Sequence, residues 1–289
     1  MSLIAHLVDN LYDTHEHNSH DFWAPGGVWI GDAGQLWVAD RNHSRIVGVT
    51  KGSPDTVIPT LDHPNIVAQS GENLLVCSLD SDNNGGIVDL QSLERKELPV
   101  TADVYASGDV GYALRGWRDE RRLEEVTSEG SRRLLSSNGI SMEGVDYIAT
   151  CTDMSLVTAD GKDVYLLVNL GSRKYSASTG GAIDYWIFKF TEGSTPKPFF
   201  EVGDINNVMD MCIDSGKLYL LRSGNGEKSI ESISLEDVSD RQKVKFEGHN
   251  PLERESDMLL GLSVRTQAEN TLMALVTSYH VGTYELKQE

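Results

Sequence analysis

Three histidines close to the amino terminus have the residue type and spacing of a metal site. His15, His17 and His20 lie in one short segment that is rich in polar residues. Neutral imidazoles are good ligands for zinc and related ions. On an extended strand His15 and His17 would share a face, while His20 would need a turn to join them, and His63 is expected as a fourth member. A solvated, histidine-rich connection is the alternative explanation.

Acidic and amide side chains recur in the connections between apolar runs of the sequence. Carboxylates that meet in a region of low dielectric raise one another's pKa or recruit a cation, commonly calcium when amide oxygens are also present. A structural ion, or no ion, is favoured over a catalytic one, because loops are polar in most acidic proteins. We expect Asp210 among the metal ligands and a ligand-binding mouth formed by Trp23, Asp62, Asp103, Asn138, Asp204, Asn207 and Asp257.

The elements that would position these side chains are short β-strands. The segment 26–50 contains three apolar runs, rich in Val, Ile and Trp and separated by turn residues. This pattern is typical of three antiparallel strands. Such a sheet alone would be covered on neither face, so it needs copies of itself on both sides.

The same unit of strand, glycine turn and strand recurs along the chain. The period is about 37 residues and lengthens to about 55, and a sixth copy from Leu262 lacks the glycine. Each unit continues into a third apolar run and usually a fourth. Four strands in each of six units predict an all-β fold, a six-bladed β-propeller. The turn glycines are Gly34, Gly71, Gly108, Gly161 and Gly216.

One propeller domain is expected over residues 1–289. The last unit ends in its third strand, so the apolar run 3–8, within a closing segment 1–10, is expected to supply the fourth strand of blade six. Insertions at 138–153 and 171–181 interrupt the period. The expected blades are 27–63, 64–100, 103–137, 154–203, 207–248 and 259–289.

The composition restricts the partners and the compartment. Lys and Arg number 25 against 44 Asp and Glu, a formal charge of −19. This charge disfavours nucleic acid, and an arginine-rich stretch at 115–133 is expected to be salt-bridged to the glutamates between its members. Cys77, Cys151 and Cys212 are odd in number and lack metal-site spacing, which indicates a reducing compartment.

Neither a signal peptide nor a membrane-spanning run is present in the sequence. We therefore expect a soluble, cytoplasmic protein with no membrane partner, although a removed leader would leave no trace. Trp29, Trp37, Trp117 and Trp186 are expected mainly in the cores of the blades.

The first unit carries a family resemblance. Asp32, Gly34, the run 36–40, the Asn42-His43 pair and the run 45–47 together resemble the NHL repeat, with Ser44 inserted after His43. The resemblance implies a propeller and fixes the phase of its blades, and His43 is expected to hold the hairpin through hydrogen bonds. It does not by itself imply an activity.

The blade number is also similar to that of the SMP-30/gluconolactonase lactonases. That resemblance implies an axial metal, held by a carboxylate at the start of the first blade and by Asn and Asp from later loops. The segment 24–29 has no Glu, whereas Asn138-Gly139 falls where the family has its asparagine-glycine pair.

Two functions remain open from the sequence. The first is an NHL-like binding or interaction scaffold, which takes a protein or small-molecule ligand at its acidic mouth. The alternative is a lactonase, esterase or lyase that depends on calcium or zinc, with Asn138, Asp204, Asp210 and the histidines as ligands or general base. Serine-nucleophile elbows, Walker loops and Rossmann glycine patterns are absent from the sequence, and no catalytic residue is assigned.

Overall fold

The protein is all-β in the computed structural model. The structure describes residues 2–13, 22–31, 34–50, 53–59, 63–78, 84–98, 100–117, 120–143, 148–172, 184–203, 207–224, 227–248, 250–253 and 257–288. Apart from short 3-10 turns such as η1 (Arg41–His43) and η3 (Ser137–Gly139), the regular elements in these ranges are strands. Within the same ranges, no helix has the length and apolar character needed to cross a membrane.

The strands of the described residues form five sheets, in which neighbours along the chain pair in order. The first sheet is β2 (Pro25–Ile30), β3 (Leu36–Asp40), β4 (Arg45–Thr50) and β5 (Ser53–Pro59). The second is β6 (Pro64–Ser70), β7 (Asn73–Ser78), β8 (Gly85–Asp89) and β9 (Arg95–Leu98). The third is β10 (Thr101–Ser107), β11 (Val110–Arg115), β12 (Arg122–Val126) and β13 (Ser131–Ser136).

The other two sheets are larger. One is β14 (Ser141–Glu143), β15 (Ile148–Asp160), β16 (Asp163–Ser172), β17 (Asp184–Thr191) and β18 (Lys197–Gly203). The last sheet has eight strands in the order β19-β20-β21-β22-β1-β25-β24-β23. Its members are β1 (Leu3–Asp13), β19 (Asn207–Asp214), β20 (Lys217–Gly224), β21 (Glu227–Ser234), β22 (Arg241–Glu247), β23 (Leu259–Gln267), β24 (Asn270–Thr277) and β25 (His280–Gln288).

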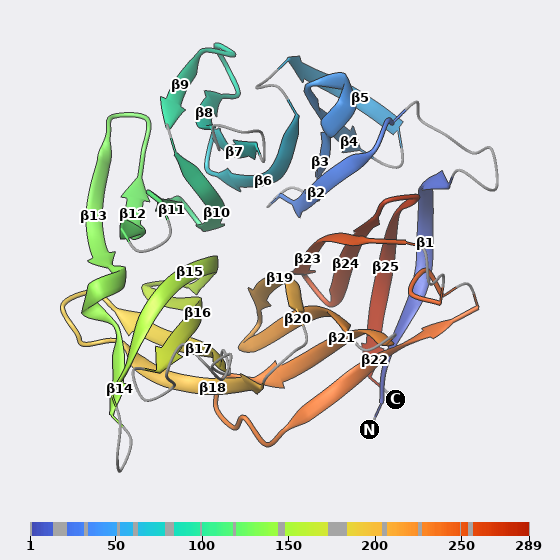
Figure 1. Ribbon diagram of the computed structural model, residues 1–289. Helices are drawn as coiled ribbons and strands as arrows, with labels where there is room; N and C mark the ends of the chain where they lie inside the picture. Colours follow the sequence, from blue (N-terminus) through green and yellow to red (C-terminus); the bar gives the residue numbers. More distant parts are fainter. Residues whose placement is uncertain are drawn as a thin grey trace.

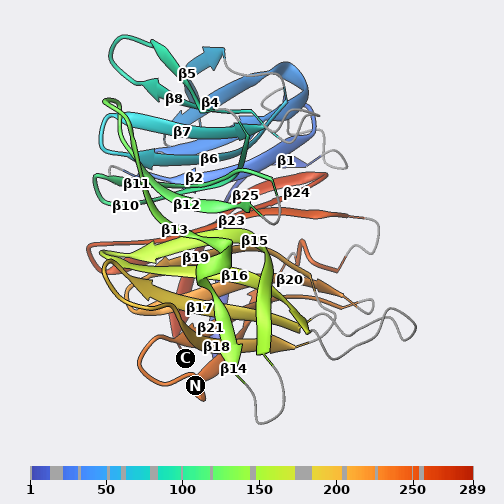
Figure 2. The same cartoon turned by 60° about the vertical axis from the view of Figure 1, so that its left-hand side comes forward.

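Six strands, two of them from the eight-stranded sheet and one from each of the other sheets, surround a common centre (Figure 1). Figure 1 shows β2, β6, β10, β15, β19 and β23 nearest the middle, with β5, β9, β13, β18, β22 and β1 toward the periphery. Within the described residues, each inner strand contacts the next in this order, and β23 contacts β2. Both chain termini lie close together at one edge, as Figure 2 also shows.

Strand β1 is paired on both of its edges. It runs antiparallel to β25, from Leu3 opposite Gln288 to Asp13 opposite His280. Its first residues also run parallel to β22, from Leu3 opposite Val244 to His6 opposite Glu247. The amino-terminal strand therefore joins the carboxy-terminal strand to the preceding part of the same sheet.

The core lies between the sheets, and it buries both faces of the inner strands. All the residues of β2 and β3 are buried, because each sheet packs between two others. Trp29 and Trp37 belong to this core, and Trp186 packs against it, as expected. The expectation is wrong for Trp117, which is 54% exposed.

Two smaller expectations from composition are confirmed. Cys77 and Cys212 are buried among apolar residues of the core. The arginine-rich stretch is salt-bridged, with Arg115 Nη1 2.7 Å from Glu124 Oε2 and Arg132 Nη2 2.5 Å from Glu125 Oε2. These pairs stabilise one sheet face rather than forming a free basic patch.

Asp40 fixes the turn of the first sheet. Its fully buried carboxylate accepts the backbone N–H of Trp23 at 2.8 Å and the Nε–H of Arg45 at 2.7 Å, and it lies 2.8 Å from Nδ1 of His43. The expected hydrogen-bonding role of His43 is confirmed. Ser44 takes the left-handed conformation (φ 50°), which lets the chain turn from η1 into β4.

Candidate functional site

Every inner strand carries a register shift, which lies close to the beginning of five of the strands and in the middle of the longer β15. A β-bulge inserts a residue that is left out of the ladder, and it re-aims the side chains beside it. In the described residues these register shifts fall between Pro25 and Val28, Pro64 and Ile66, Thr101 and Asp103, Met154 and Leu156, Val208 and Asp210, and Leu259 and Gly261. The inner strands therefore share one local geometry, although their sequences differ.

The bulges surround a cavity of about 190 Å³, which we call the axial cavity. Each of the six inner strands contributes its bulge residue to the wall. The cavity is thus built by one bulge from each inner strand. These residues are Gly27, Asn65, Ala102, Ser155, Met209 and Leu260.

Asp103 and Asp210 follow their bulges at equivalent positions and have equivalent hydrogen bonds. Asp103 accepts the N–H of Val104 on Oδ1 at 2.9 Å and that of Val157, on the neighbouring inner strand, on Oδ2 at 2.7 Å. Asp210 accepts the N–H of Met211 at 2.8 Å and that of Leu262 at 2.7 Å. Each carboxylate therefore connects two inner strands while it also lines the axial cavity.

The two carboxylates hold their protons unusually tightly. Burial raises the pKa of Asp210 to about 7, against the hydrogen bonds from Leu262 and Met211, which favour the ionised form. Burial also raises the pKa of Asp103 well above its ordinary value, and the negative charge of Asp210 raises it further. Burial therefore disfavours ionisation of both acids, and an ionised Asp210 further disfavours ionisation of Asp103.

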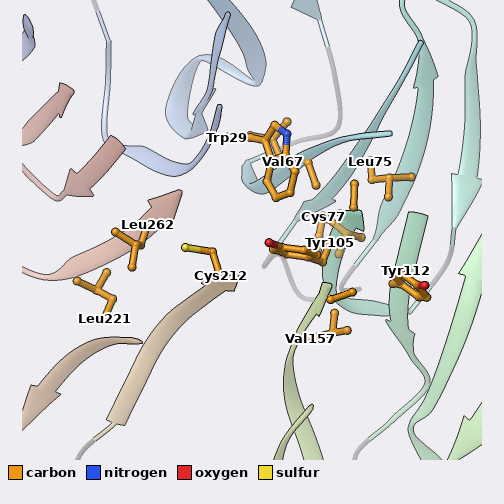
Figure 3. Packing of buried hydrophobic residues seen from close by; sticks show 14 of the residues in the cluster. Trp29, Val67, Leu75, Cys77, Tyr105, Tyr112, Val157, Cys212, Leu221 and Leu262 are labelled. Atoms are coloured by element: carbon orange, nitrogen blue, oxygen red, sulfur yellow. The ribbon is translucent and has the colours of Figure 1, made fainter. Parts of the chain in front are cut away.

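Two aromatic side chains, Trp29 and Tyr105, line the cavity. The hydroxyl of Tyr105 spans to β19, where it donates to the carbonyl of Ile213 at 3.2 Å and accepts its N–H at 3.1 Å. The rings of Trp29 and Tyr105 meet edge to face, with centroids 4.9 Å apart. Figure 3 shows the Trp29 ring next to the Tyr105 ring. Burial raises the pKa of the Tyr105 phenol, so it stays neutral.

Asn65 adds an amide to the same cavity. It is 8% exposed and lines the cavity, and its side chain has no hydrogen bond to another described residue. Among the described residues no side chain or backbone group satisfies this amide, and a ligand in the cavity would supply hydrogen bonds to it. Ser155 of β15 contributes a hydroxyl to the same wall.

The structure brings Asp103 and Asp210 together and leaves other expected site residues apart from them. Trp23 is 59% exposed and lies beside His43, with ring centroids 5.6 Å apart. His63 and Asn138 are exposed, and neither lines the axial cavity. Asp257 is buried, and its Oδ2 accepts the hydroxyl of Thr277 at 3.4 Å.

The other expected site residues, or their side chains, lie outside the part of the chain that the structure describes. Asn207 begins β19, but its side chain lies outside what is described. His15, His17, His20, Asp62 and Asp204 lie outside the described residues altogether. The proposed histidine cluster and its link to His63 therefore stay predictions.

Sequence reasoning assigned no site role to Asn65, Ser155, Trp29 or Tyr105, which share the cavity with the two acids. Asn65 belongs to an inter-unit connection, so its position in the sequence could have indicated it. Trp29 and Tyr105 sit inside apolar runs, where a core role is the ordinary expectation. The bulges that aim these residues depend on pairing with neighbouring strands, which alternation in a sequence does not reveal.

The donor set of the cavity fits calcium better than zinc. The described residues contain no group of three or more His, Cys, Asp or Glu side chains placed to hold a metal ion. The cavity offers oxygen donors from Asp103, Asp210, Asn65 and Ser155, and calcium takes about six to eight such ligands. The first inner strand adds no carboxylate, since a Cβ on Gly27 would lie 2.6 Å from the carbonyl oxygen of Asn65.

The raised pKa of Asp210 predicts a pH-dependent effect of Asp210→Asn. Between about pH 4 and pH 7 the folded chain binds more protons at Asp210 than the unfolded chain does. The stabilisation of the fold by protonated Asp210 is therefore complete below the ordinary pKa of Asp and is lost as pH rises through about 7. The single amide oxygen of Asn replaces two carboxylate oxygens that accept the N–H groups of Met211 and Leu262, so the variant is less stable than the wild type at about pH 5. The difference in Tm between wild type and variant should shrink from about pH 5 to about pH 8.

Asp89→Asn is the matched control for this titration. Hydrogen bonds from Ser92 lower the pKa of Asp89, so its contribution does not change over the same pH range. Thermal denaturation of the three proteins at a series of pH values measures both differences. A difference for Asp210→Asn that is constant or grows with pH would contradict a raised pKa.

Comparisons with known proteins identify the fold and no closer relationship. No protein-family model matches the chain, and no curated protein is similar to it in sequence. Among solved structures it is similar to a streptogramin B lyase, with a TM-score of 0.57 and 11% identity over 99% of this chain and 97% of that one. The chain is also similar to virginiamycin B lyase from Staphylococcus aureus, with a TM-score of 0.57 and 11% identity over 100% of both chains.

A chain of a nidogen/laminin complex is similar too, with a TM-score of 0.56 and 12% identity over 84% of this chain and 92% of that one. Identities this low carry over the architecture but no activity, ligand or partner. Together with the sheets arranged around a common centre, these similarities identify the chain as a β-propeller.

Proposed function

We propose that the chain is a six-bladed, NHL-like propeller that works as a binding scaffold, with its ligand or partner taken up at an acidic mouth over the axial cavity. The cycle of contacts among the inner strands supports six blades. The eight-stranded sheet divides into β19–β22 and β23–β25 with β1, which is the arrangement expected if the amino-terminal strand completes the last blade.

The observation that carries this proposal is the pair Asp103 and Asp210. Two carboxylates at equivalent positions of one cavity, Asp103 buried and Asp210 partly buried, are costly to the fold, because each loses hydration and an ionised Asp210 disfavours ionisation of Asp103. Groups of strongly perturbed pKa in a concave site are candidates for binding. The other expected mouth residues, Trp23, Asp62, Asn138, Asp204, Asn207 and Asp257, would surround them on the connections between blades.

The partner is a protein or a small molecule with positive charge at the contact. A formal charge of −19 disfavours nucleic acid, whose phosphates would be repelled. The scarcity of cysteine supports a reducing, cytoplasmic location.

Hydrogen–deuterium exchange in the presence of a hexalysine peptide tests the proposal, with a hexaglutamate peptide as control. Slower exchange is expected at the starts of β6, β10 and β19, which surround the acids, and only with hexalysine. Protection confined to the opposite ends of these strands, near Gly71 and Gly108, would contradict an acidic binding mouth. The absence of any protection by hexalysine would contradict it as well.

A metal-dependent lactonase, esterase or lyase is the second candidate, favoured by the oxygen donors of the axial cavity. Asp103, Asp210, Asn65 and Ser155 would hold calcium there, and the ion would polarise a bound carbonyl. The histidine set His15, His17, His20 and His63 is the corresponding proposal for zinc. Turnover of lactone or ester substrates that is abolished by a chelator and by Asp103→Asn would establish this function in place of the scaffold.

A further inference from the structure

We propose that the axial cavity binds a small organic ammonium group, whose charge is taken up by Asp103 and Asp210 and whose N–H groups reach Asn65. This inference rests on the proposed function and names the class of ligand for the same site. The ammonium can belong to a free amine or to a lysine side chain, because both present the same chemistry.

The polar part of the wall matches the donors of an ammonium ion. A primary ammonium has three N–H donors and no acceptor. Each oxygen of Asp103 and Asp210 accepts one backbone N–H and keeps further acceptor capacity toward the cavity. The Asn65 amide, nine-tenths buried and without a hydrogen-bond partner among the described residues, offers a third acceptor.

The rest of the wall suits carbon rather than water. Its side chains are mainly aliphatic or aromatic, and Trp29 and Tyr105 are each only 7% exposed. Aromatic rings stabilise alkylammonium groups through cation–π contact, and the aliphatic groups would pack against the substituents on nitrogen. A calcium ion would instead need about six to eight oxygen ligands, and the wall offers few.

The size of the cavity limits the enclosed part of the ligand. At about 30 Å³ for each water molecule, a cavity of about 190 Å³ corresponds to roughly six waters. That volume holds an ammonium head with a few carbon atoms, while a larger ligand would extend out over the mouth. Met209, 36% exposed, belongs to the wall and would contact such an extension.

The protonation of the acid pair couples binding to pH. A bound ammonium favours the ionised form of both carboxylates, so a proton that the pair holds leaves to solvent when the ammonium binds, which conserves charge. The other charged or titratable groups that act on the pair are Arg121, which favours the ionised form of Asp103, and the Cys212 thiol, which lies near Asp210. Affinity for the ammonium is therefore expected to rise from about pH 6 to about pH 8.

Isothermal titration calorimetry with methylammonium chloride tests the inference on the wild-type chain. Calcium chloride and potassium chloride at equal ionic strength are the competing cations, and Nα-acetyl-lysinamide represents a lysine side chain. Methylammonium is expected to bind with release of protons, and more tightly than either metal ion. Titration of Nα-acetyl-lysinamide separates the two sources, since binding of methylammonium alone indicates a free amine.

Variants localise the site. The double variant Asp103→Asn/Asp210→Asn should weaken methylammonium binding by at least roughly tenfold, as for loss of charge-assisted hydrogen bonds. Asp240→Asn removes one carboxylate from the exposed turn after β21 and should leave the affinity unchanged. If the double variant does not fold, the preference for methylammonium over calcium and the pH dependence in the wild type still decide the question.

The outcomes separate this inference from the proposed function. Calcium binding without methylammonium binding overturns the ammonium inference and leaves the acidic mouth in place. Failure of every cation to bind, or binding that the double variant does not weaken, overturns the ammonium inference as well, and hexalysine protection then decides separately whether an acidic mouth exists.

Discussion

Ala5→Asp is expected to lower Tm by roughly 6–12 °C, the largest effect of any single substitution considered for the fold. Ala5 is fully buried in β1, where it lies opposite Phe246 of β22 and Leu286 of β25. A carboxylate there would be surrounded by apolar side chains without a partner, at a cost of at least about 3 kcal/mol. About 2–4 °C in Tm correspond to each kcal/mol in a chain of this size class.

Val8→Asp is the matched control, because it introduces the same carboxylate three positions later on the same strand. Val8 is 53% exposed, so its change in Tm should stay within about 2 °C. Thermal denaturation followed by circular dichroism measures both variants. Equal losses of Tm in the two variants would show that the buried edge pairing of β1 does not hold the last sheet together.

Asp40→Ala is expected to destabilise the first sheet by about 2–3 kcal/mol, in the range for loss of hydrogen bonds to a charged group. The carboxylate has no exposure, and it is the shared partner of the Trp23 N–H, His43 and Arg45. Alanine leaves these three groups without their acceptor and leaves the Arg45 cation, 25% exposed, without its ion pair. Water at the partly exposed Arg45 side chain offsets part of the free energy that is lost with this ion pair.

Two further variants make this measurement specific. Asp40→Asn keeps one acceptor oxygen and should give an intermediate loss in the free energy of unfolding. Asp237→Ala removes an exposed carboxylate whose hydrogen bonds to described residues come from Ser239, so its effect should be within about 0.5 kcal/mol. Urea denaturation gives all three values, and a loss for Asp40→Ala no larger than that for Asp237→Ala would refute the shared-acceptor role.

These two effects bear on function because, in the part of the chain that the structure describes, the wall of the axial cavity comes from the inner strands. Each inner strand contributes its bulge residue to the cavity, and contact between β23 and β2 is needed to enclose it. Substitutions that loosen β1 or the first sheet should therefore also weaken binding at Asp103 and Asp210, without touching either residue.

Much of the fold could be predicted from local patterns. The glycine turns at Gly71, Gly108, Gly161 and Gly216 have positive φ angles of 56°, 58°, 58° and 72°, a conformation that favours glycine. The strands on either side of each turn pair with each other as the alternation of the sequence predicts. Such signals survive in a single sequence because they depend on neighbouring residues only.

The candidate site was predictable in part. Asp103 and Asp210 stand out because each precedes an apolar run at the start of a unit, and both line the axial cavity. Asn138 and His63 occupy similar places in the sequence, yet they are exposed and do not line it. The difference lies in how each connection enters its strand, which is decided by bulges and by the packing of the next sheet.

The amino-acid sequence by itself determined that this chain forms short β-strands joined by tight turns, because alternation and turn glycines act over a few residues. It also determined the acidic charge and the position of the two acids along the chain. Only the tertiary structure decided that Trp29, Asn65, Asp103 and Asp210 share one cavity. Contacts such as the Tyr105 hydroxyl with Ile213, which joins residues 108 positions apart, depend on the packing of whole sheets, and no local pattern encodes them.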